Sequence, residues 1–206
     1  MLRAMEVGRD IRVGPSEHML DVIRTARLVL RCWRGDDAAL LKEAVESSLP
    51  ELRMWVPWAM EYPSTVDGIK ARLERMRAQF VAGEDWPLGI FDSEQTRVLG
   101  GAGLHPHVGA GGLAIGYWIR TDATRQGLAT EVAEALCAAA FARAGVERVE
   151  VHCDRDNDRS AAIPKHLGFT LTRTFPQDVI TTRGRQRETQ VWTLLRAEFE
   201  ASRAGT

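Results

Sequence analysis

The sequence predicts one α/β (α+β) domain in which helices flank a mixed sheet. Its 206 residues suit a single domain with a well-buried core. Hydrophobic residues make up 45% of the chain and charged residues 27%, which is ordinary globular composition. The expected order of elements, β-α-α-β-β-β-α-β-α-β-β, departs from the regular strand–helix alternation of a doubly wound sheet, and this favours the mixed arrangement.

The N-terminal part divides into an extension and a first strand. Residues 1–19 lack clean periodicity and contain a Gly-Pro pair, so we expect a loosely ordered extension ahead of a domain over residues 20–200. The segment 23–33 alternates, which is typical of a strand, with Leu28, Leu30 and Cys32 on one face and Val29 and Arg31 on the other.

Two helices are expected next. The first takes Asp36 or Asp37 as its N-cap and runs through Ser48, with an apolar stripe at helical spacing formed by Leu40, Leu41, Val45 and Leu49. A Trp- and Pro-rich link, LRMWVPWAMEYPS, leads to the second helix. Ser64 is the expected cap of that helix, and Gly83 is its expected stop.

The rest of the chain is expected to form further strands and two more helices. Three strands are expected at Trp86–Asp92, Arg97–His107 and Leu113–Arg120. They are followed by a helix at Leu128–Ala144, a strand at Arg148–Cys153, a short helix at Arg159–Leu167, and strands at Phe169–Phe175 and Thr189–Leu195.

Composition excludes several classes of protein. Lys plus Arg total 27 against 28 Asp plus Glu, so a general nucleic-acid binder is not expected. A basic cluster at Arg183, Arg185 and Arg187 is interpreted as a solvated hairpin turn. The 3 cysteines are sparse and odd in number, which indicates a reducing compartment. No apolar run approaches the ~20 residues of a membrane helix, and the N-terminus lacks a signal-peptide core. We therefore expect a cytoplasmic protein without membrane contact.

The segment most informative about chemistry is a polar loop that opens into a helix. The loop RTDATRQG follows a strand and leads into the Ala-rich helix that begins at Leu128. A helix N-terminus presents unpaired backbone N–H groups and a partial positive charge, which suits a pyrophosphate. Gly127 allows close approach to the backbone, and Arg125 adds a charge. The sequence has no GxxxxGK[ST], and its Gly100–Gly103 run does not continue as GxGxxG into a helix, so neither common nucleotide-binding loop fits.

Several motifs in order resemble one family. IGYWIRTDATRQGLATEV followed by VHCDRDNDRSAAIPKHLGF resembles the GNAT acetyltransferase superfamily, and its RimJ/RimL branch in particular. The segments TARLVLRCWRGDD, LRMWVPWA and GAGLHPHV agree with it. The resemblance spans about residues 23–195. It implies a GNAT fold, whose mixed, mostly antiparallel sheet splays between the fourth and fifth strands, and acetyl-CoA as the acetyl donor.

The resemblance also implies a cofactor site. Its residues would be Trp118, Ile119, Arg125, Gln126, Gly127, Leu128, Ala129, Thr130, Asn157 and Ser160. Two positions depart from the family pattern, because Thr124 stands where Gln or Arg is common and Arg125 where Gly is common. Taken alone, Asn157 would be interpreted as a helix cap and Ser160 as a partner of a local backbone group.

The catalytic assignments are hypotheses from residue chemistry. The amine must lose a proton, the carbonyl oxygen must be stabilised, and the thiolate must be protonated. We assign these roles to His105, to the backbone N–H of Ile119 and to Ser160. The family's usual Tyr acid is absent, because that position is Pro164. The family's usual Glu base is also absent, and Asp178 lies nearby without clean alignment. A lone His on a strand is as often structural, and an imidazole titrates in the right range for a base.

The aromatic link offers an acceptor wall. Trp58 and Glu61 would line it, with Glu61 attracting a cationic amine, whereas Trp55 would pack in the core. No metal is expected, because His152 and Cys153 are adjacent on a strand and point to opposite faces. The expected function is transfer of acetyl to a primary amine, either a protein N-terminus or a small amine, by a monomer or homodimer. A non-catalytic acyl-CoA sensor and an antibiotic-modifying enzyme remain alternatives.

Overall fold

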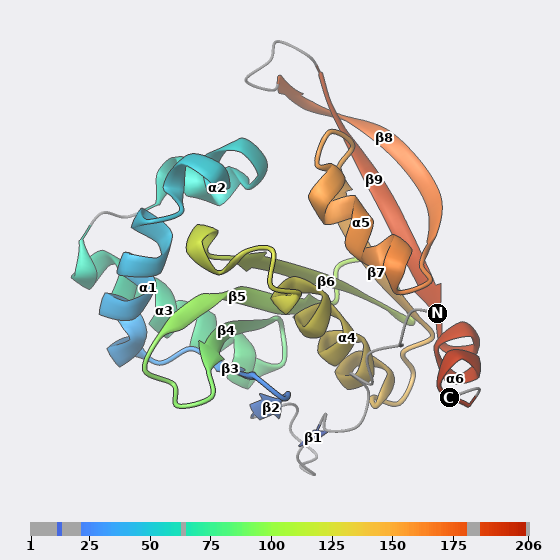
Figure 1. Cartoon of the computed structure of the whole chain (residues 1–206), viewed down its shortest axis with the longest axis horizontal. Helices are drawn as coiled ribbons and strands as arrows, with labels where there is room; N and C mark the ends of the chain where they lie inside the picture. Colours follow the sequence, from blue (N-terminus) through green and yellow to red (C-terminus); the bar gives the residue numbers. More distant parts are fainter. Residues whose placement is uncertain (1–11, 14–21, 63–64, 181–185, 205–206) are drawn as a thin grey trace.

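The described strands build one open sheet. The structure is a computed structural model, and it describes residues 12–13, 22–62, 65–180 and 186–204. Within these ranges the strands form a nine-stranded sheet in the order β1-β2-β3-β4-β5-β6-β7-β9-β8 (Figure 1). Their bounds are β1 Arg12–Val13, β2 Val22–Arg24, β3 Leu28–Cys32, β4 Trp86–Asp92, β5 Val98–His105, β6 Gly112–Ile119, β7 Arg148–Asp154, β8 Thr170–Ile180 and β9 Gln186–Leu195.

Helices cover both faces of this sheet. The α-helices are α1 Ala38–Glu46, α2 Leu49–Trp55, α3 Val66–Ala82, α4 Leu128–Phe141, α5 Asp158–His166 and α6 Arg196–Ala204. There are three short 3-10 helices: η1 Gly35–Asp37 lies between β3 and α1, η2 Pro57–Glu61 between α2 and α3, and η3 Thr121–Ala123 between β6 and α4. Figure 1 shows α1, α2 and α3 grouped on one side, with α4 and α5 nearer to the long β8–β9 hairpin.

The alternation in β3 explains why both faces are buried. Leu28 and Leu30 lie in the hydrophobic cluster that contains α4, whereas Val29 lies in the cluster that contains α1 and α3. Arg31 is on the same face as Val29, where its guanidinium lies 4.0 Å from the Phe91 ring centroid. It also forms a bidentate hydrogen bond with Asp37 at 2.8 Å, so a charge is accommodated in the core through pairing. The two predicted faces are confirmed over Leu28–Cys32, but the predicted strand 23–33 is wrong in extent, because residues 25–27 form a turn that separates β3 from its antiparallel neighbour β2.

The sheet splays where the sequence predicted. The β6–β7 pair is the parallel pair of the described sheet, and its register runs only from Gly112↔Arg148 to Ile115↔Val151. Beyond that point Gly116–Ile119 pairs with β5 alone, and His152–Asp154 pairs with β9 alone. The split therefore opens between the fourth and fifth of the predicted strands.

Some predicted boundaries needed correction. The link after the first helix is itself largely helical, because α2 and η2 occupy most of LRMWVPWAMEYPS. Thr65, rather than the predicted Ser64, accepts the capping hydrogen bond from Gly68 at 3.1 Å, and Ser64 lies outside the described residues. The predicted stop is confirmed, since Gly83 ends α3 with φ 72°.

Near both ends of the chain, the structure differs from the prediction. Within residues 1–19, Arg12 and Val13 form β1 and pair with β2, and the remainder lies outside the described residues. The C-terminal helix α6 was not predicted. None of the described helices is both long and apolar enough to cross a membrane. Cys32, Cys137 and Cys153 are all free.

Candidate acetyl-transfer site

The loop before α4 presents open backbone amides. Gly127 is the N-cap residue with φ 76°, and no side chain caps the helix. The amides of the first turn, Leu128 to Thr130, consequently have no intrahelical acceptor. Arg125 also has a positive φ of 61°, which is uncommon for a residue with a Cβ. The backbone here is shaped as the resemblance implied, with Arg125 in a conformation that glycine adopts more easily.

An ion pair that the sequence did not reveal anchors this loop. Arg27, in the turn before β3, donates to the Glu131 carboxylate through Nε at 2.7 Å and to the Gln126 carbonyl at 2.8 Å. The Glu131 side chain is only 6% exposed, so its charge depends on this partner. The contact fixes the first turn of α4 to the sheet edge. Gln126 is itself exposed, and its carbonyl is the group held.

The end of β6 directs an amide into the split. Arg120 N–H donates to the Leu99 carbonyl on β5 at 2.9 Å. Amides alternate in direction along a strand, so the N–H of Ile119 points the other way, toward the open side facing β7. Ile119 thus offers a backbone donor in the split, which is the geometry expected of an oxyanion donor.

Buried charge fixes the strand end itself. The Arg120 side chain is 3% exposed and bonds Glu43 at 2.6 Å and Asp122 at 2.7 Å. The hydrogen bond from Arg120 lowers the pKa of Glu43 below its ordinary value. Ser48 Oγ accepts from Thr121 N–H at 3.0 Å, so α1 and the residues before α2 hold the loop from the other side.

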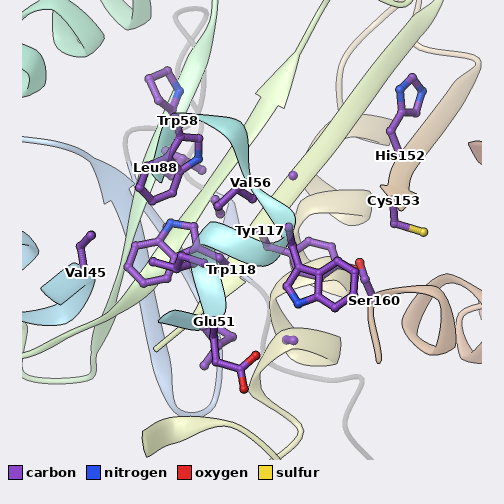
Figure 2. Close-up of a pocket in the computed structure, with 18 of the residues that line it drawn as sticks. Val45, Glu51, Val56, Trp58, Leu88, Tyr117, Trp118, His152, Cys153 and Ser160 are labelled. Atoms are coloured by element: carbon purple, nitrogen blue, oxygen red, sulfur yellow. The ribbon is translucent and has the colours of Figure 1, made fainter. Parts of the chain in front are cut away.

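A cavity of about 680 Å³ opens beside the split. Figure 2 shows Trp58, Trp118 and Glu51 on one side of it and His152, Cys153 and Ser160 on the other. The Trp58 and Trp118 ring centroids are 6.0 Å apart. Trp58 lines the cavity, whereas Glu61 is exposed on η2 and is not among the lining residues. Trp55, expected in the core, lines the cavity too.

Glycines form the floor of this cavity. A Cβ at Gly101 would lie 2.6 Å from the Trp118 indole nitrogen, and a Cβ at Gly103 would lie 2.6 Å from the His105 ring. Gly116, across from Gly103, has His105 Nε2 at 3.5 Å from its Cβ position. The glycine-rich stretch of β5 thus leaves room for two aromatic rings to lie close to the sheet.

His105 is held by a carboxylate. Its Nδ1 lies 2.6 Å from Asp85 Oδ1, and both side chains are partly exposed. This contact orients the ring and leaves Nε2 over Gly116, on the cavity side. A histidine fixed at one nitrogen by a carboxylate can accept a proton at the other. Asp85 was not singled out from the sequence, because it lies in a turn 20 residues before its partner.

Ser160 and Asn157 meet the cavity at the start of α5. The Asn157 side chain accepts from Ser160 N–H at 3.1 Å, so Asn157 does cap the helix, and both residues line the cavity. Tyr117 lies near Ser160. Burial raises the pKa of its phenol, and the Tyr117 hydroxyl has no hydrogen-bond partner among the described residues. Pro164 lies within α5, where no Tyr can act.

The comparisons with known proteins decide the family. Residues 27–170 match the family model described as "Acetyltransferase (GNAT) domain". This chain belongs to the GNAT acetyltransferase family. It is an acetyl-CoA-dependent N-acetyltransferase, as the order of its motifs predicted.

Individual relatives of this GNAT acetyltransferase agree. "Putative ribosomal N-acetyltransferase YdaF" from Bacillus subtilis is 25% identical over 179 residues, which cover 85% of this chain and 95% of the relative. The solved structure of RimL, a ribosomal L7/L12 alpha-N-protein acetyltransferase in complex with coenzyme A, has a TM-score of 0.75 at 19% identity, with 84% of this chain and 97% of RimL covered. The microcin C7 self-immunity acetyltransferase MccE, in complex with acetyl-CoA and AMP, has a TM-score of 0.76 at 16% identity, with coverage of 86% and 98%. Because these sequence identities are low, the two solved structures are evidence for the fold alone.

The GNAT chain fits acetyl-CoA as the donor. The open amides at the start of α4 suit a pyrophosphate, and the unpaired edge of β6 suits an extended amide-bearing arm. In the part of the chain that the structure describes, no three His, Cys, Asp or Glu side chains gather as a metal site would require. His152, considered in that context, pairs instead with Glu150 at 2.7 Å.

One residue of the predicted basic turn has a different place. Arg187 on β9 is 11% exposed and lies 2.8 Å from the buried Asp154 carboxylate, so it is not on a solvated turn. Its guanidinium also donates to the Met54 carbonyl of α2 at 2.9 Å. Arg187 therefore connects the two sides of the cavity. Arg183 and Arg185 lie outside the described residues.

Proposed function

We propose that this GNAT acetyltransferase acetylates the α-amine of a peptide or protein N-terminus. The names of YdaF and RimL, both tied to ribosomal proteins, support a protein acceptor. Elementary chemistry supports it too, because an α-amine titrates near ~8 whereas a lysine amine titrates near ~10.4, so far more of the former is neutral at physiological pH. The cavity beside the split gives an extended chain room to enter.

In this proposal His105 removes the proton from the attacking amine. The Asp85 carboxylate holds the ring through Nδ1, and Nε2 accepts the proton. The pairing of His105 with Asp85 over a glycine floor is the observation that carries the assignment. Acid–base catalysis by a positioned side chain is worth about 10² to 10⁴ in rate.

Two further groups complete the proposed reaction. The Ile119 N–H, directed into the split, stabilises the charge that develops on the thioester oxygen. Ser160 gives a hydrogen bond or a proton to the departing thiolate from the start of α5. Backbone groups and one side chain hold the acetyl-CoA donor. They are the amides of Leu128, Ala129 and Thr130, the turn of Arg125, Gln126 and Gly127, the backbone of Trp118 and Ile119, and Asn157.

Acetyl transfer to matched N-terminal peptides tests the proposal. Release of the coenzyme A thiol is followed across pH for the wild type and for His105→Ala, with acetyl-CoA affinity measured separately by calorimetry. We expect kcat/KM to fall about 100-fold or more in the variant, with loss of the acid limb of the pH profile and unchanged acetyl-CoA affinity. Ser160→Ala should lower kcat and likewise leave that affinity unchanged.

Each proposed role has a result that contradicts it. An unaltered pH profile in His105→Ala would remove the base assignment. Tight acetyl-CoA binding with no thiol release for any peptide, polyamine or aminoglycoside would point instead to an acyl-CoA sensor.

The cytoplasmic location that we also propose rests on the three free cysteines. The state of the chain as monomer or homodimer stays a prediction.

A further inference from the structure

Among the described residues, one charge that lines the cavity has no partner of opposite charge. Seven described residues with ionisable acidic, guanidinium or imidazole side chains line it: Glu51, Arg72, Asp85, His105, His152, Asp154 and Arg159. Six of them have a partner of opposite charge. Asp85 pairs with His105, His152 with Glu150, Asp154 with Arg187, and Arg159 lies 4.0 Å from Glu51.

Arg72 is the exception among these described lining residues. It projects from α3, is half-buried, and has neither an ion pair nor a hydrogen bond with another described residue. Its guanidinium carbon lies 5.4 Å from the centroid of the Trp58 ring, and Trp58 in turn contacts Trp118 above the glycine floor. Burial lowers the pKa of this guanidinium, as expected of a charge that has lost water without gaining an anion.

The groups nearest to Arg72 cannot supply the missing charge. Tyr62 packs on Trp58 with ring centroids 5.8 Å apart, but burial raises the pKa of its phenol to about 12, so it is neutral at physiological pH. Glu46, which is close enough to influence Tyr62, already pairs with Lys42. An unpaired half-buried guanidinium against an aromatic wall is suited to a carboxylate brought by a ligand.

We propose that Arg72 is a specificity residue that binds an anionic group of the acceptor, a carboxylate located close to the amine that is acetylated. This rests on the proposed function, since the same cavity must admit the amine. Two sources share this chemistry: an acidic side chain near the N-terminus of a peptide, and the carboxylate of a small amino acid. The cavity therefore selects against acceptors that carry additional positive charge near the amine, because the unpaired charge of Arg72 would repel that charge.

Matched acceptors test this subsite. Peptides that differ only in having Asp, Asn or Lys at the second or third position form one arm, and glycine against glycinamide forms the other. Acetylation kinetics are measured for the wild type and for Arg72→Gln, Arg72→Lys and Arg72→Glu. The control is Arg75→Gln, which removes an exposed charge from the same helix. Folding of each variant is checked by thermal melting, and acetyl-CoA affinity by calorimetry.

A charge-assisted hydrogen bond predicts a preference of about 10- to 100-fold for the acidic acceptor over its amide in the wild type. That ratio should fall to about 1 in Arg72→Gln and persist in part in Arg72→Lys. The Arg72→Glu variant should prefer the Lys peptide over the Asp and Asn peptides. Arg75→Gln should keep the wild-type ratio. Equal use of acid and amide acceptors by the wild type, or a ratio that survives in Arg72→Gln, would overturn the proposal.

A binding measurement separates this proposal from the proposed function. The same peptides are titrated by calorimetry into protein saturated with coenzyme A, where no transfer can occur. If the acidic peptide binds more tightly and Arg72→Gln abolishes the difference while no acetylation is seen, the subsite stands and the catalytic proposal fails. If acetylation proceeds with no preference in either measurement, the subsite fails and the catalytic proposal stands.

Discussion

At the scale of single residues, the glycines of β5 determine where aromatic rings can lie. Gly103→Ala would place a Cβ 2.6 Å from the His105 ring, so the imidazole must leave the floor. We expect kcat/KM to fall by about 10- to 100-fold, because a misplacement of about 1 Å is enough to lose a well-oriented proton transfer. Stability should change little, because the clash is with a side chain that can rotate.

Gly116→Ala is the matched control for Gly103→Ala. Its Cβ would lie 3.5 Å from His105 Nε2, which is an ordinary van der Waals contact. Steady-state kinetics with a constant peptide acceptor should therefore rank the wild type first, Gly116→Ala close behind and Gly103→Ala well below. Equal activity of the two variants would show that the ring position over Gly103 has no part in catalysis.

Residue chemistry in the sequence predicted some partners and missed others. His105 and Trp58 could be selected because their chemistry is visible in isolation, and Ser160 because of the family resemblance. All three line one cavity. Asp85 and Arg72 could not, because a carboxylate in a turn and an arginine on a helix are usually solvated. Only the approach of β5 to the residues before β4, and of α3 to η2, gives them a role.

At the scale of elements, most strands, the long helices and the short helix α5 followed from the sequence pattern, whereas β1, α2 and α6 did not. The alternation of β3 and the apolar stripe of α1 are local signals, and both were read correctly. By contrast, α2 has only 7 residues and carries a Pro near its start, so the sequence resembled a loop. Its helical form depends on tertiary contacts, including Arg187 from β9, which is distant in sequence.

The junction of α1 with the end of β6 should be sensitive to acid. The hydrogen bond from Arg120 lowers the pKa of Glu43 in the folded protein below its ordinary value of 4.5. Stability from this group is therefore fully present above that ordinary value and is lost as pH falls through the lower, folded value. Urea unfolding at a series of pH values should show a shallower acid loss in Glu43→Gln than in the wild type.

The comparison is direct because Glu43 is largely exposed, so its amide replacement needs no repacking of the core. At neutral pH, Glu43→Gln should be somewhat less stable than the wild type, and the two should converge as the carboxylate becomes protonated. Parallel curves for the two proteins between neutral and acid pH would mean that the pair with Arg120 contributes nothing to folding.

At the scale of the whole molecule, two sides of one cavity come from distant parts of the chain. The α2–η2 segment forms one side, and the end of β7 with α5 forms the other (Figures 1 and 2). The resemblance to a known family was enough to predict the split of the sheet, which lies within the consecutive β6–α4–β7 unit. The closure of the cavity was not predictable, since it depends on how a late hairpin meets an early helix.

Arg187 joins these two sides through its contacts with Met54 and Asp154. Arg187→Met would remove both the hydrogen bond to the Met54 carbonyl and the ion pair with Asp154, whose side chain is 5% exposed. A buried carboxylate left without its cation costs about 3 kcal/mol in the free energy of unfolding. We also expect KM for the acceptor to rise several-fold, because α2 loses its contact with β9, while acetyl-CoA affinity stays the same.

The neighbouring pair Arg155–Glu188 supplies the control. It joins the turn after β7 to β9 at 2.6 Å, but its side chains are 60% and 38% exposed, so Arg155→Met should change stability little and leave KM unchanged. In the double variant Arg187→Met/Asp154→Asn the unpaired charge is removed, so stability should partly recover while the raised acceptor KM persists. Recovery of both quantities together would mean that the contact with α2 has no influence on the acceptor, and that Arg187 acts only by neutralising Asp154.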